Sequence, residues 1–278
     1  MAGITAAAVK ALRDKTGLPM MDCKNALKET EGDEAAAIDV LRKKGLKTME
    51  KRSGRATSFG RMGVYADLSD GVGAMVELKC ESAPVAAHEE FIGLANDLAR
   101  QLAKGPAVQT ADELLDQPSP SQDGKTLREQ KDELFNRIRE VFNVGRMVRM
   151  DGSCGAYTHN AGTVHGVLLQ VEGDNEEAAK DICMHITAMH PKALVKEDLD
   201  AEVVAKEREI LSAAARAEGK PEGIIEKMVE GRMRNFYAES VLSEQAFVKD
   251  ETKKTSVGQY AKQNDIKLVR FEHWQLGG

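Results

Sequence analysis

The feature that most constrains the fold is an internal repeat of a hairpin pattern. Residues 63–80 and residues 155–173 each open with Gly-x-Tyr, pass through a polar corner that contains glycine, and return as a longer apolar run. Asp70-Gly71 lies at the first corner, and an Asp-Gly pair between alternating runs is a strong sign of a β-hairpin. Each hairpin precedes an acidic segment and a helical pattern. We therefore predict an α+β protein with a duplicated antiparallel core, in which a strand–strand–helix unit occurs twice.

The remaining elements are predicted from apolar residues that recur at helical or strand spacing. Helices are expected at residues 4–15, 22–30, 34–44, 89–104, 127–142, 176–190, 201–217 and 223–237. Thr5 and Asp33 are expected to cap the first and the third of these helices. Gly45 is expected to stop the third helix, so that residues 47–61 form a partly basic linker. A strand at 146–150 is expected to join the second sheet, and a strand at 267–272 is expected to close it.

These elements predict four modules along the chain. They are a three-helix bundle at residues 1–55, a first core subdomain at 56–145, a second core subdomain at 146–200 together with 239–278, and a protruding helical hairpin at 201–238. The bundle is small and has a meagre core, which favours docking on a partner. In the hairpin, two helices joined by a short turn should pack antiparallel along an apolar seam that includes Val203, Ile210 and Ile224.

The net charge, the short apolar runs and the composition of the first residues argue against several classes of protein. The chain carries 39 Lys and Arg against 45 Asp and Glu, for a net charge of −6, and a general nucleic-acid binder needs a basic surface instead. No run approaches the ~18 apolar residues of a membrane-spanning helix. The first residues carry charges from Lys10 onward and lack the apolar region of a signal peptide. We expect a cytoplasmic protein that binds neither nucleic acid nor membranes directly.

The residues that usually carry catalysis form no recognisable constellation. The four cysteines stand alone, which favours buried thiols in a reducing compartment. His185 and His190 lie five residues apart, which does not fit the i, i+4 spacing of a helical metal pair. Cys80 has His88 nearby but no third group to orient it, so a thiol enzyme is the weakest alternative. We predict no catalytic residue, no metal site and no cofactor, and hence no enzyme.

One apolar turn stands out as a candidate docking surface. Residues 18–21, Leu-Pro-Met-Met, connect the first two predicted helices, and four apolar residues at such a turn cannot all point inward. Either one or two methionines fill the base of the bundle, or Leu18, Met20 and Met21 form a soft patch that binds another protein. The patch is the functional interpretation.

Two longer motifs resemble the bacterial translation elongation factor Ts family. Residues 12–17 (LRDKTG) followed by 20–27 (MMDCKNAL) resemble its N-terminal signature, and residues 226–233 (EKMVEGRM) resemble a second motif in the return helix of a coiled coil. Weaker matches follow at residues 188–191, 247–248 and 256–259. The resemblance covers essentially the whole chain, in order.

The resemblance implies both an architecture and a function. The family has a bundle like the ubiquitin-associated (UBA) domain, a core of two subdomains and a protruding coiled coil. Its members are guanine-nucleotide exchange factors for elongation factor Tu, the GTPase that delivers aminoacyl-tRNA. Such a factor binds elongation factor Tu–GDP and promotes exchange of GDP for GTP by stabilising the nucleotide-free state. The coupling is thermodynamic and needs no catalytic side chain.

The resemblance also implies the residues that contact the GTPase. They are Leu18, Met20, Met21, Ser82, Ala83, Pro84, Val85, Ile138, His159, Met228 and Arg232. One position departs from the family. In the family, a Thr-Asp-Phe-Val segment helps to dislodge Mg²⁺ from the GTPase. This chain has Ser-Ala-Pro-Val at 82–85 and therefore lacks both the carboxylate and the aromatic ring.

That departure leaves two alternatives open. In the first, the chain is a working exchange factor with weakened Mg²⁺ dislocation. In the second, it is a paralogue or chaperone that binds elongation factor Tu with little exchange activity. Pro84 is expected to bias Ala83 toward an extended backbone, so the loop should keep a rigid shape in either case.

Overall fold

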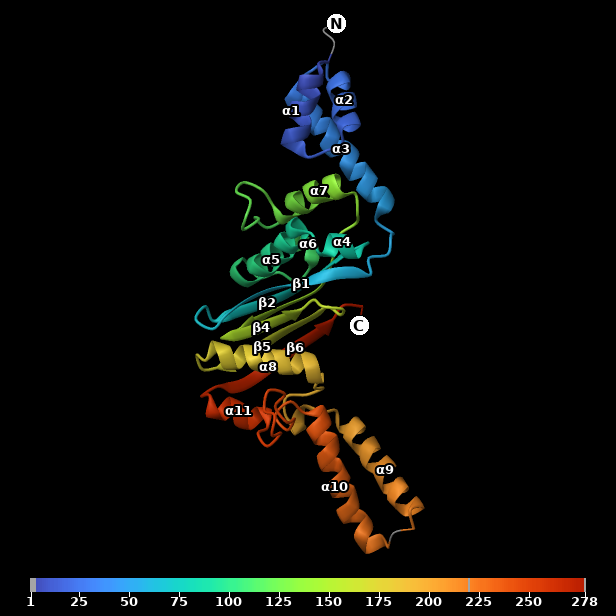
Figure 1. Ribbon diagram of the computed structural model, residues 1–278, viewed down its shortest axis with the longest axis vertical. Helices are drawn as coiled ribbons and strands as arrows, with labels where there is room; N and C mark the ends of the chain where they lie inside the picture. Colours follow the sequence, from blue (N-terminus) through green and yellow to red (C-terminus); the bar gives the residue numbers. More distant parts are fainter. Residues whose placement is uncertain (1–3, 220, 278) are drawn as a thin grey trace. The chain divides into compact units, whose positions relative to one another are not determined.

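The computed structural model describes residues 4–219 and 221–277, and it separates into two compact units of mixed helix and sheet (Figure 1). The first unit contains Met1–Gly63, Val76–Val148 and Leu276–Gly278, and the second contains Val64–Met75 and Arg149–Gln275. The α+β class predicted from the sequence is therefore correct, whereas the predicted division into four modules stays a prediction. Within the described ranges, no helix is both long and apolar enough to cross a membrane.

Three helices begin the first unit: α1 (Ala6–Thr16), α2 (Met20–Glu29) and α3 (Glu34–Arg52). Thr5 caps α1 as predicted, because its hydroxyl accepts the Ala8 N–H, and Gly17 ends the helix in the left-handed conformation. Helix α2 starts at Met20, two residues earlier than expected. The three helices share a small core made of Val9, Leu12, Leu18, Cys23, Ala26, Leu27, Ala37 and Leu41.

The predicted end of α3 is wrong, and packing explains why. The helix continues through Gly45 to Arg52, so the first residues of the predicted linker are helical. A Cβ atom at position 45 would lie 1.6 Å from Oδ1 of Asn136 in α7 (Leu127–Ile138). Glycine is therefore needed here for the close approach of two helices and does not stop α3.

The first unit also contains four more helices and one part of a three-stranded sheet; residues 64–67, 72–75 and 149–151 of that sheet belong to the second unit. Strands β1 (Phe59–Asp67), β2 (Val72–Cys80) and β3 (Asn143–Asp151) follow one another in space in that order. The helices between them are α4 (Ala83–Ala86), α5 (Glu89–Lys104), α6 (Ala111–Leu115) and α7. Helix α5 has its predicted bounds, whereas α7 ends four residues early because Arg139 adopts the left-handed conformation.

Strand β3 was expected in the second sheet, and that expectation is wrong. It lies beside β2, where the buried carboxylate of Glu77 accepts hydrogen bonds from Arg146. The guanidinium Nη2 lies 2.8 Å from Glu77 Oε1. An ion pair of this kind satisfies the only strongly polar side chain on the buried stretch of β2 and fixes β3 against that strand.

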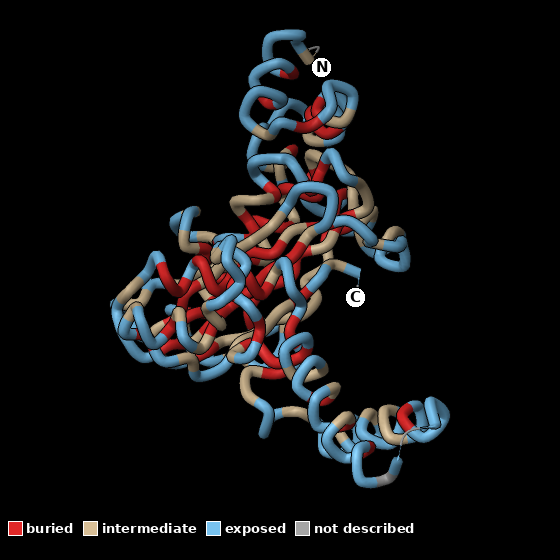
Figure 2. Tube along the Cα trace, turned by 60° about the horizontal axis from the view of Figure 1, so that its bottom comes forward, coloured by how far each residue is buried: buried red, intermediate tan, exposed pale blue. Residues whose placement is uncertain are grey.

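The second unit contains an antiparallel sheet in the order β4 (Cys154–His159), β5 (His165–Glu172) and β6 (Lys267–Gln275). The second hairpin and the closing strand are thus as predicted. Helices α8 (Glu176–Met189) and α11 (Val257–Gln263) contribute to the buried core, which Figure 2 shows in red. Its larger members are Val167, Leu169, Val171, Ile182, Ile186, Leu242, Phe247 and Val257.

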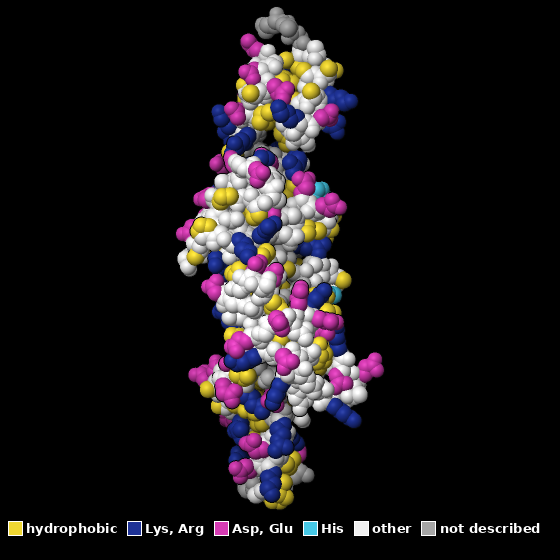
Figure 3. Space-filling view, turned by 90° about the vertical axis from the view of Figure 1, so that its left-hand side faces the viewer, with side chains coloured by type: hydrophobic (Ala, Val, Ile, Leu, Met, Phe, Trp, Pro, Cys, Tyr) yellow, Lys and Arg dark blue, Asp and Glu magenta, His cyan; other side chains and the backbone are white. Residues whose placement is uncertain are grey.

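Helices α9 (Ala201–Ala217) and α10 (Glu222–Ser240) form a hairpin within the second unit, after the short 3₁₀ turn Lys196–Asp198. Ala215, Ile225, Val229 and Met233 are buried between the two helices. Val203, Ile210 and Ile224 were expected in this seam but are 43%, 52% and 49% exposed. Each precedes a more buried apolar residue, and helical neighbours point about 100° apart, so only one of each pair reaches the narrow seam. Figure 3 shows hydrophobic side chains on the outer surface of this hairpin.

Candidate functional site

In the apolar turn between α1 and α2, some side chains are buried and others are exposed. Leu18 is buried in the bundle core, whereas Met20 and Met21 at the start of α2 are 41% and 60% exposed. Pro19 precedes the helix and leaves its N-terminus without a side-chain cap. The patch open to a partner therefore consists of the two methionine side chains, whose flexible thioethers adapt readily to a protein surface.

Residues 82–85 form the first turn of α4 and not an extended loop. Ser82 is extended, but Ala83 and Pro84 are helical, so the predicted bias of Ala83 toward an extended backbone is wrong. Proline is well tolerated in a first helical turn, where its missing N–H is not needed. Val85 is buried, while Ala83 and Pro84 face outward.

The ends of this turn are held by side chains from neighbouring segments. The Ser82 hydroxyl donates to Glu140 at 2.7 Å, and the Arg61 guanidinium donates to the carbonyl of Ala86 at 2.8 Å. The exposed surface of the turn is consequently a methyl group and a pyrrolidine ring on a fixed backbone. This surface can make steric contact with a bound protein, but it carries neither a charge nor an aromatic ring.

The other candidate contacts lie further along the chain. Ile138 is the half-buried last residue of α7, in the first unit. His159 ends β4 in the second unit, with its Nδ1 3.4 Å from the Tyr157 hydroxyl and its Nε2 3.1 Å from the Ala161 carbonyl. Met228 and Arg232 lie half-buried on α10, where Arg232 forms an ion pair with Glu218 at 2.7 Å. The structure thus groups Leu18–Met21, Ser82–Val85 and Ile138 in the first unit and the remaining candidates in the second.

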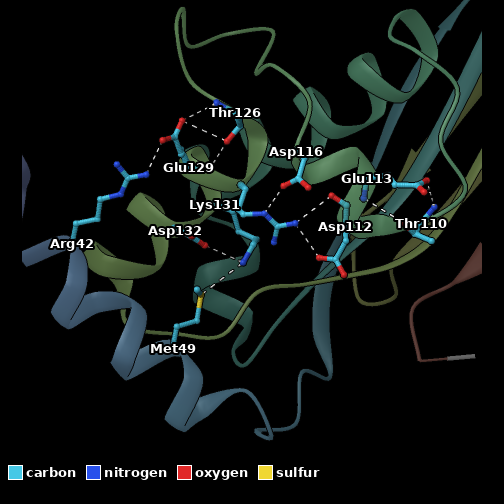
Figure 4. Close-up of polar contacts among 11 residues, drawn as sticks. Arg42, Met49, Thr110, Asp112, Glu113, Asp116, Thr126, Glu129, Lys131 and Asp132 are labelled. Carbon is cyan, nitrogen blue, oxygen red and sulfur yellow. Dashed lines mark hydrogen bonds and ion pairs between the residues drawn. The ribbon is translucent and has the colours of Figure 1, made fainter. Parts of the chain in front are cut away.

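Polar contacts tie the bundle to α7 within the first unit (Figure 4). Arg42 on α3 pairs with Glu129 at 2.7 Å, and Glu129 also accepts the backbone N–H of Thr126 in a capping box. That backbone hydrogen bond, followed by the bond from Arg42, holds the pKa of Glu129 below its usual range. The Lys131 ammonium lies 3.7 Å from the Met49 sulfur. The Met20–Met21 patch is therefore carried on helices that α7 anchors.

The cysteines offer no activated nucleophile. All four are buried, and burial raises the pKa of the Cys80 thiol to about 11, with the carboxylates of Glu140 and Glu81 adding to the shift. Cys80 Sγ lies 3.3 Å from the Ser82 carbonyl, and His88 instead accepts the Glu90 N–H to cap α5. A thiol that stays protonated at neutral pH is a poor nucleophile, which argues against the thiol-enzyme alternative.

One group of side chains was missed by the sequence reasoning. His165, His190 and His273 come from β5, the end of α8 and β6, and the fold brings their ring nitrogens together. Burial lowers the pKa of His165, with smaller effects from His190 and His159, and burial together with the other two rings lowers the pKa of His273 to about 4. No spacing rule finds this cluster, because its members lie 25 and 83 residues apart; only the pairing of β5 with β6 could have indicated it.

Comparison with known proteins decides the family. The family model described as Elongation factor TS matches residues 81–278. The chain belongs to the elongation factor Ts family. It is 40% identical over 277 residues to Elongation factor Ts of Methylococcus capsulatus, covering 99% of this chain and 92% of that relative. The relatives from Kineococcus radiotolerans and Renibacterium salmoninarum are 40% and 41% identical over 282 and 286 residues, and both chains are covered in full.

This membership confirms the resemblance drawn from the two sequence motifs, and it makes the chain a relative of translation elongation factors. In this elongation factor Ts family member the three-helix bundle lies before the matched residues 81–278. The similarity to the relatives nevertheless runs through it, because it covers 99–100% of the chain.

Proposed function

We propose that the chain is a guanine-nucleotide exchange factor that binds elongation factor Tu–GDP and promotes release of GDP and its exchange for GTP. The observation that carries the proposal is the similarity to Elongation factor Ts over the whole length of the chain. In the same proposal α1–α3 act as the UBA-like docking module and α9–α10 as the protruding coiled coil, beside the two core subdomains at residues 56–145 and at 146–200 with 239–278.

Exchange of this kind needs binding energy and no bond chemistry. A GTPase holds GDP through its phosphate-binding loop and Mg²⁺. A factor that binds the nucleotide-free GTPase more tightly than the GDP form lowers the affinity for GDP by the same ratio, because the linkage is reciprocal. No side chain of the factor then has to act as an acid, base or nucleophile. We therefore propose no enzymatic reaction, no cofactor and a cytoplasmic place of action.

The docking surface in this proposal begins with Met20 and Met21. Both side chains are exposed and lie next to each other on α2. Methionine side chains that become buried when two proteins bind are effective apolar anchors. The half-buried Ile138 and His159 add contacts from the core, and Met228 and Arg232 add contacts from α10. The exchange step then follows from displacing elements of the GTPase that hold the nucleotide.

The contribution of α4 is steric in this proposal. Ala83 and Pro84 are exposed on a turn that Ser82 and Arg61 hold at its ends. They can press on a helix of the GTPase, but they cannot compete electrostatically near Mg²⁺. This pair supports a second candidate function, an elongation factor Tu-binding chaperone with little exchange activity.

The two candidates are separated by measuring binding and release in parallel. Fluorescent GDP is released from elongation factor Tu of the same organism with and without the chain, over a range of Mg²⁺ concentrations. The exchange factor accelerates release, whereas the chaperone binds without acceleration. Replacing Ala83→Asp together with Pro84→Phe should raise the release rate, most at high Mg²⁺, and Ala87→Asp serves as a charge-matched control at the exposed end of the same turn. A rate that stays equal in all three proteins at every Mg²⁺ concentration would remove α4 from the mechanism.

A second substitution tests the contact from the core. His159→Ala should slow GDP release at subsaturating factor, because the imidazole at the end of β4 would no longer reach the GTPase. An unchanged rate at both saturating and subsaturating factor would take His159 out of the site.

A further inference from the structure

We propose that His165, His190 and His273 form a binding site for one Zn²⁺ ion in the second unit. One ring nitrogen of each histidine lies within 4.8 Å of the corresponding nitrogens of the other two. Among the residues that the structure describes, no other group of three or more His, Cys, Asp or Glu ligands comes this close together. The proposal is independent of nucleotide exchange.

The sheet places two of the three ligands. His165 is the first residue of β5, and Val167 pairs with His273 of β6, so the two histidines are diagonal neighbours on the same face of antiparallel strands. Their rings stack at a centroid distance of 5.2 Å and an angle of 15°, with His165 Nδ1 3.0 Å from His273 Nε2. Two imidazole nitrogens therefore converge from a backbone that pairing holds rigidly.

The third ligand comes from the end of α8. His190 is its C-cap residue and adopts the left-handed conformation, with φ 49° and ψ 52°. Few residues other than glycine and asparagine adopt this conformation at low cost. Its ring meets the other two edge-to-face, with centroids 5.2 Å from His165 and 4.9 Å from His273.

The distances suit a small ion that prefers nitrogen. Zn²⁺ binds histidine at ~2.0–2.1 Å in tetrahedral geometry, which puts neighbouring ligand nitrogens ~3.3 Å apart. The His165–His273 pair is already near that spacing, and the exposed His190 side chain is free to close the third side. Three imidazoles favour Zn²⁺ over Mg²⁺ and Ca²⁺, which select oxygen.

The surroundings leave the site reachable from solvent. His165 is buried, His273 is half-buried and His190 is exposed, so one side of the cluster opens outward. A groove of about 340 Å³ beside it is lined by Pro191, Arg270 and His273, among others. Water or a carboxylate of a docked protein can fill the fourth position, as at zinc sites with three protein ligands. The buried thiols do not compete for the ion in the folded chain.

The competing explanation of the geometry is a hydrogen bond between two neutral imidazoles, with His190 resting against them. That arrangement binds no metal. Bound Zn²⁺ would instead cross-link the end of α8 to β5 and β6, and it would raise the thermal unfolding temperature by an amount that grows with the logarithm of the free Zn²⁺ concentration once this exceeds the Kd.

The test measures metal binding by the full chain without a histidine tag. Zn²⁺ is titrated by calorimetry, and Co²⁺ is used as a probe because its visible absorption reports tetrahedral coordination. The decisive variant is His190→Asn, since asparagine keeps the left-handed conformation and removes the imidazole. The matched control is His88→Asn, which removes an exposed imidazole from the end of another helix and leaves a good cap.

We expect one Zn²⁺ per chain, a tetrahedral Co²⁺ spectrum and no binding of Mg²⁺. Affinity should fall at least ~100-fold in His190→Asn, because even the loss of a group that only supports a ligand costs 10–100-fold, and it should stay unchanged in His88→Asn. A second variant, His273→Gln with its fold checked by circular dichroism, should lose binding as well. No Zn²⁺ bound by the wild-type chain, equal binding by His190→Asn, or an equal loss in the control would overturn the proposal.

Discussion

Replacing Gly45 by alanine should weaken the packing of α3 on α7, although alanine is the better helix former. The added Cβ would lie 1.6 Å from Oδ1 and 2.3 Å from Cγ of Asn136. Asn136 is only 8% exposed, so its amide group has little room to move away. Overpacking of this kind costs ~1–3 kcal/mol, while the change from glycine to alanine inside a helix contributes ~0.8–1 kcal/mol of stability. We expect a net destabilisation of ~0–2 kcal/mol.

A matched variant isolates the packing effect from the helix propensity. Gly93 lies inside α5 in the same unit, and a Cβ there would meet no atom within 4 Å. Gly93→Ala should therefore stabilise the unit by ~0.8–1 kcal/mol. The difference between the two variants cancels the propensity and leaves the overpacking cost of ~1–3 kcal/mol.

Hydrogen exchange of α3 and α7 peptides, followed by mass spectrometry, measures the local free energy of opening. The single Trp274 lies in the second unit and does not report on these helices. Combining Gly45→Ala with Asn136→Ala should restore protection relative to the sum of the single variants, because the colliding amide is gone. Equal effects of Gly45→Ala and Gly93→Ala, or strictly additive effects with Asn136→Ala, would refute the account of this helix contact.

Three further predictions follow from the same structure. Met20→Ala with Met21→Ala should weaken binding to elongation factor Tu by ~1–3 kcal/mol in calorimetry while circular dichroism stays unchanged; unchanged affinity would show that the turn is not an interface. Thermal stability should fall as the pH decreases from 7 to 5, because burial lowers the pKa of His185, so the unfolded chain binds a proton there that the folded chain excludes. Burial also lowers the pKa of His165 and His273, which act in the same direction, so His185→Gln should reduce that slope without abolishing it; an unaltered slope would show that His185 does not contribute. Ellman's reagent should react slowly with the native chain at pH 7.5, since burial raises the pKa of both Cys80 and Cys154 to about 11; rapid reaction would contradict their burial.

Local signals predicted much of the fold correctly. Helix caps such as Thr5 and Asp33, and turn residues such as Gly71, act on their immediate neighbours, so the sequence contains the whole cause of the structure they form. The same holds for the bounds of α5, whose apolar stripe is regular. A change from strand-like to helical spacing of the apolar residues can be recognised in the sequence alone, without knowing what the segment packs against.

The predictions from sequence were wrong where a segment far away in the chain determines the local structure. Gly45 has the signature of a helix end, but its role is set by Asn136, 91 positions later in the chain. Strand β3 could pair with either sheet by its pattern alone, and the buried carboxylate of Glu77 is what gives Arg146 a partner. The three-histidine cluster depends on the register of β5 with β6, which no local pattern contains.

The candidate docking residues could be predicted from the sequence only in part. The apolar composition of the turn at 18–21 predicted that some side chains stay outside, and burial shows which ones, since Leu18 is inside and Met21 is not. The shape of the Ala83–Pro84 turn could not be predicted, because proline is compatible both with an extended loop and with a first helical turn.

The most direct test of whether the chain acts as a nucleotide-exchange factor is GDP release at substoichiometric concentrations of the chain. Elongation factor Tu of the same organism, loaded with fluorescent GDP, is mixed with excess unlabelled GDP and one-twentieth of its concentration of this protein. If the chain is an exchange factor, all of the labelled nucleotide should leave at a rate that rises with the amount of the chain, and Met20→Ala with Met21→Ala should lower that rate. Release that follows the spontaneous rate, or that stops after one equivalent per chain, would contradict the assignment as an exchange factor.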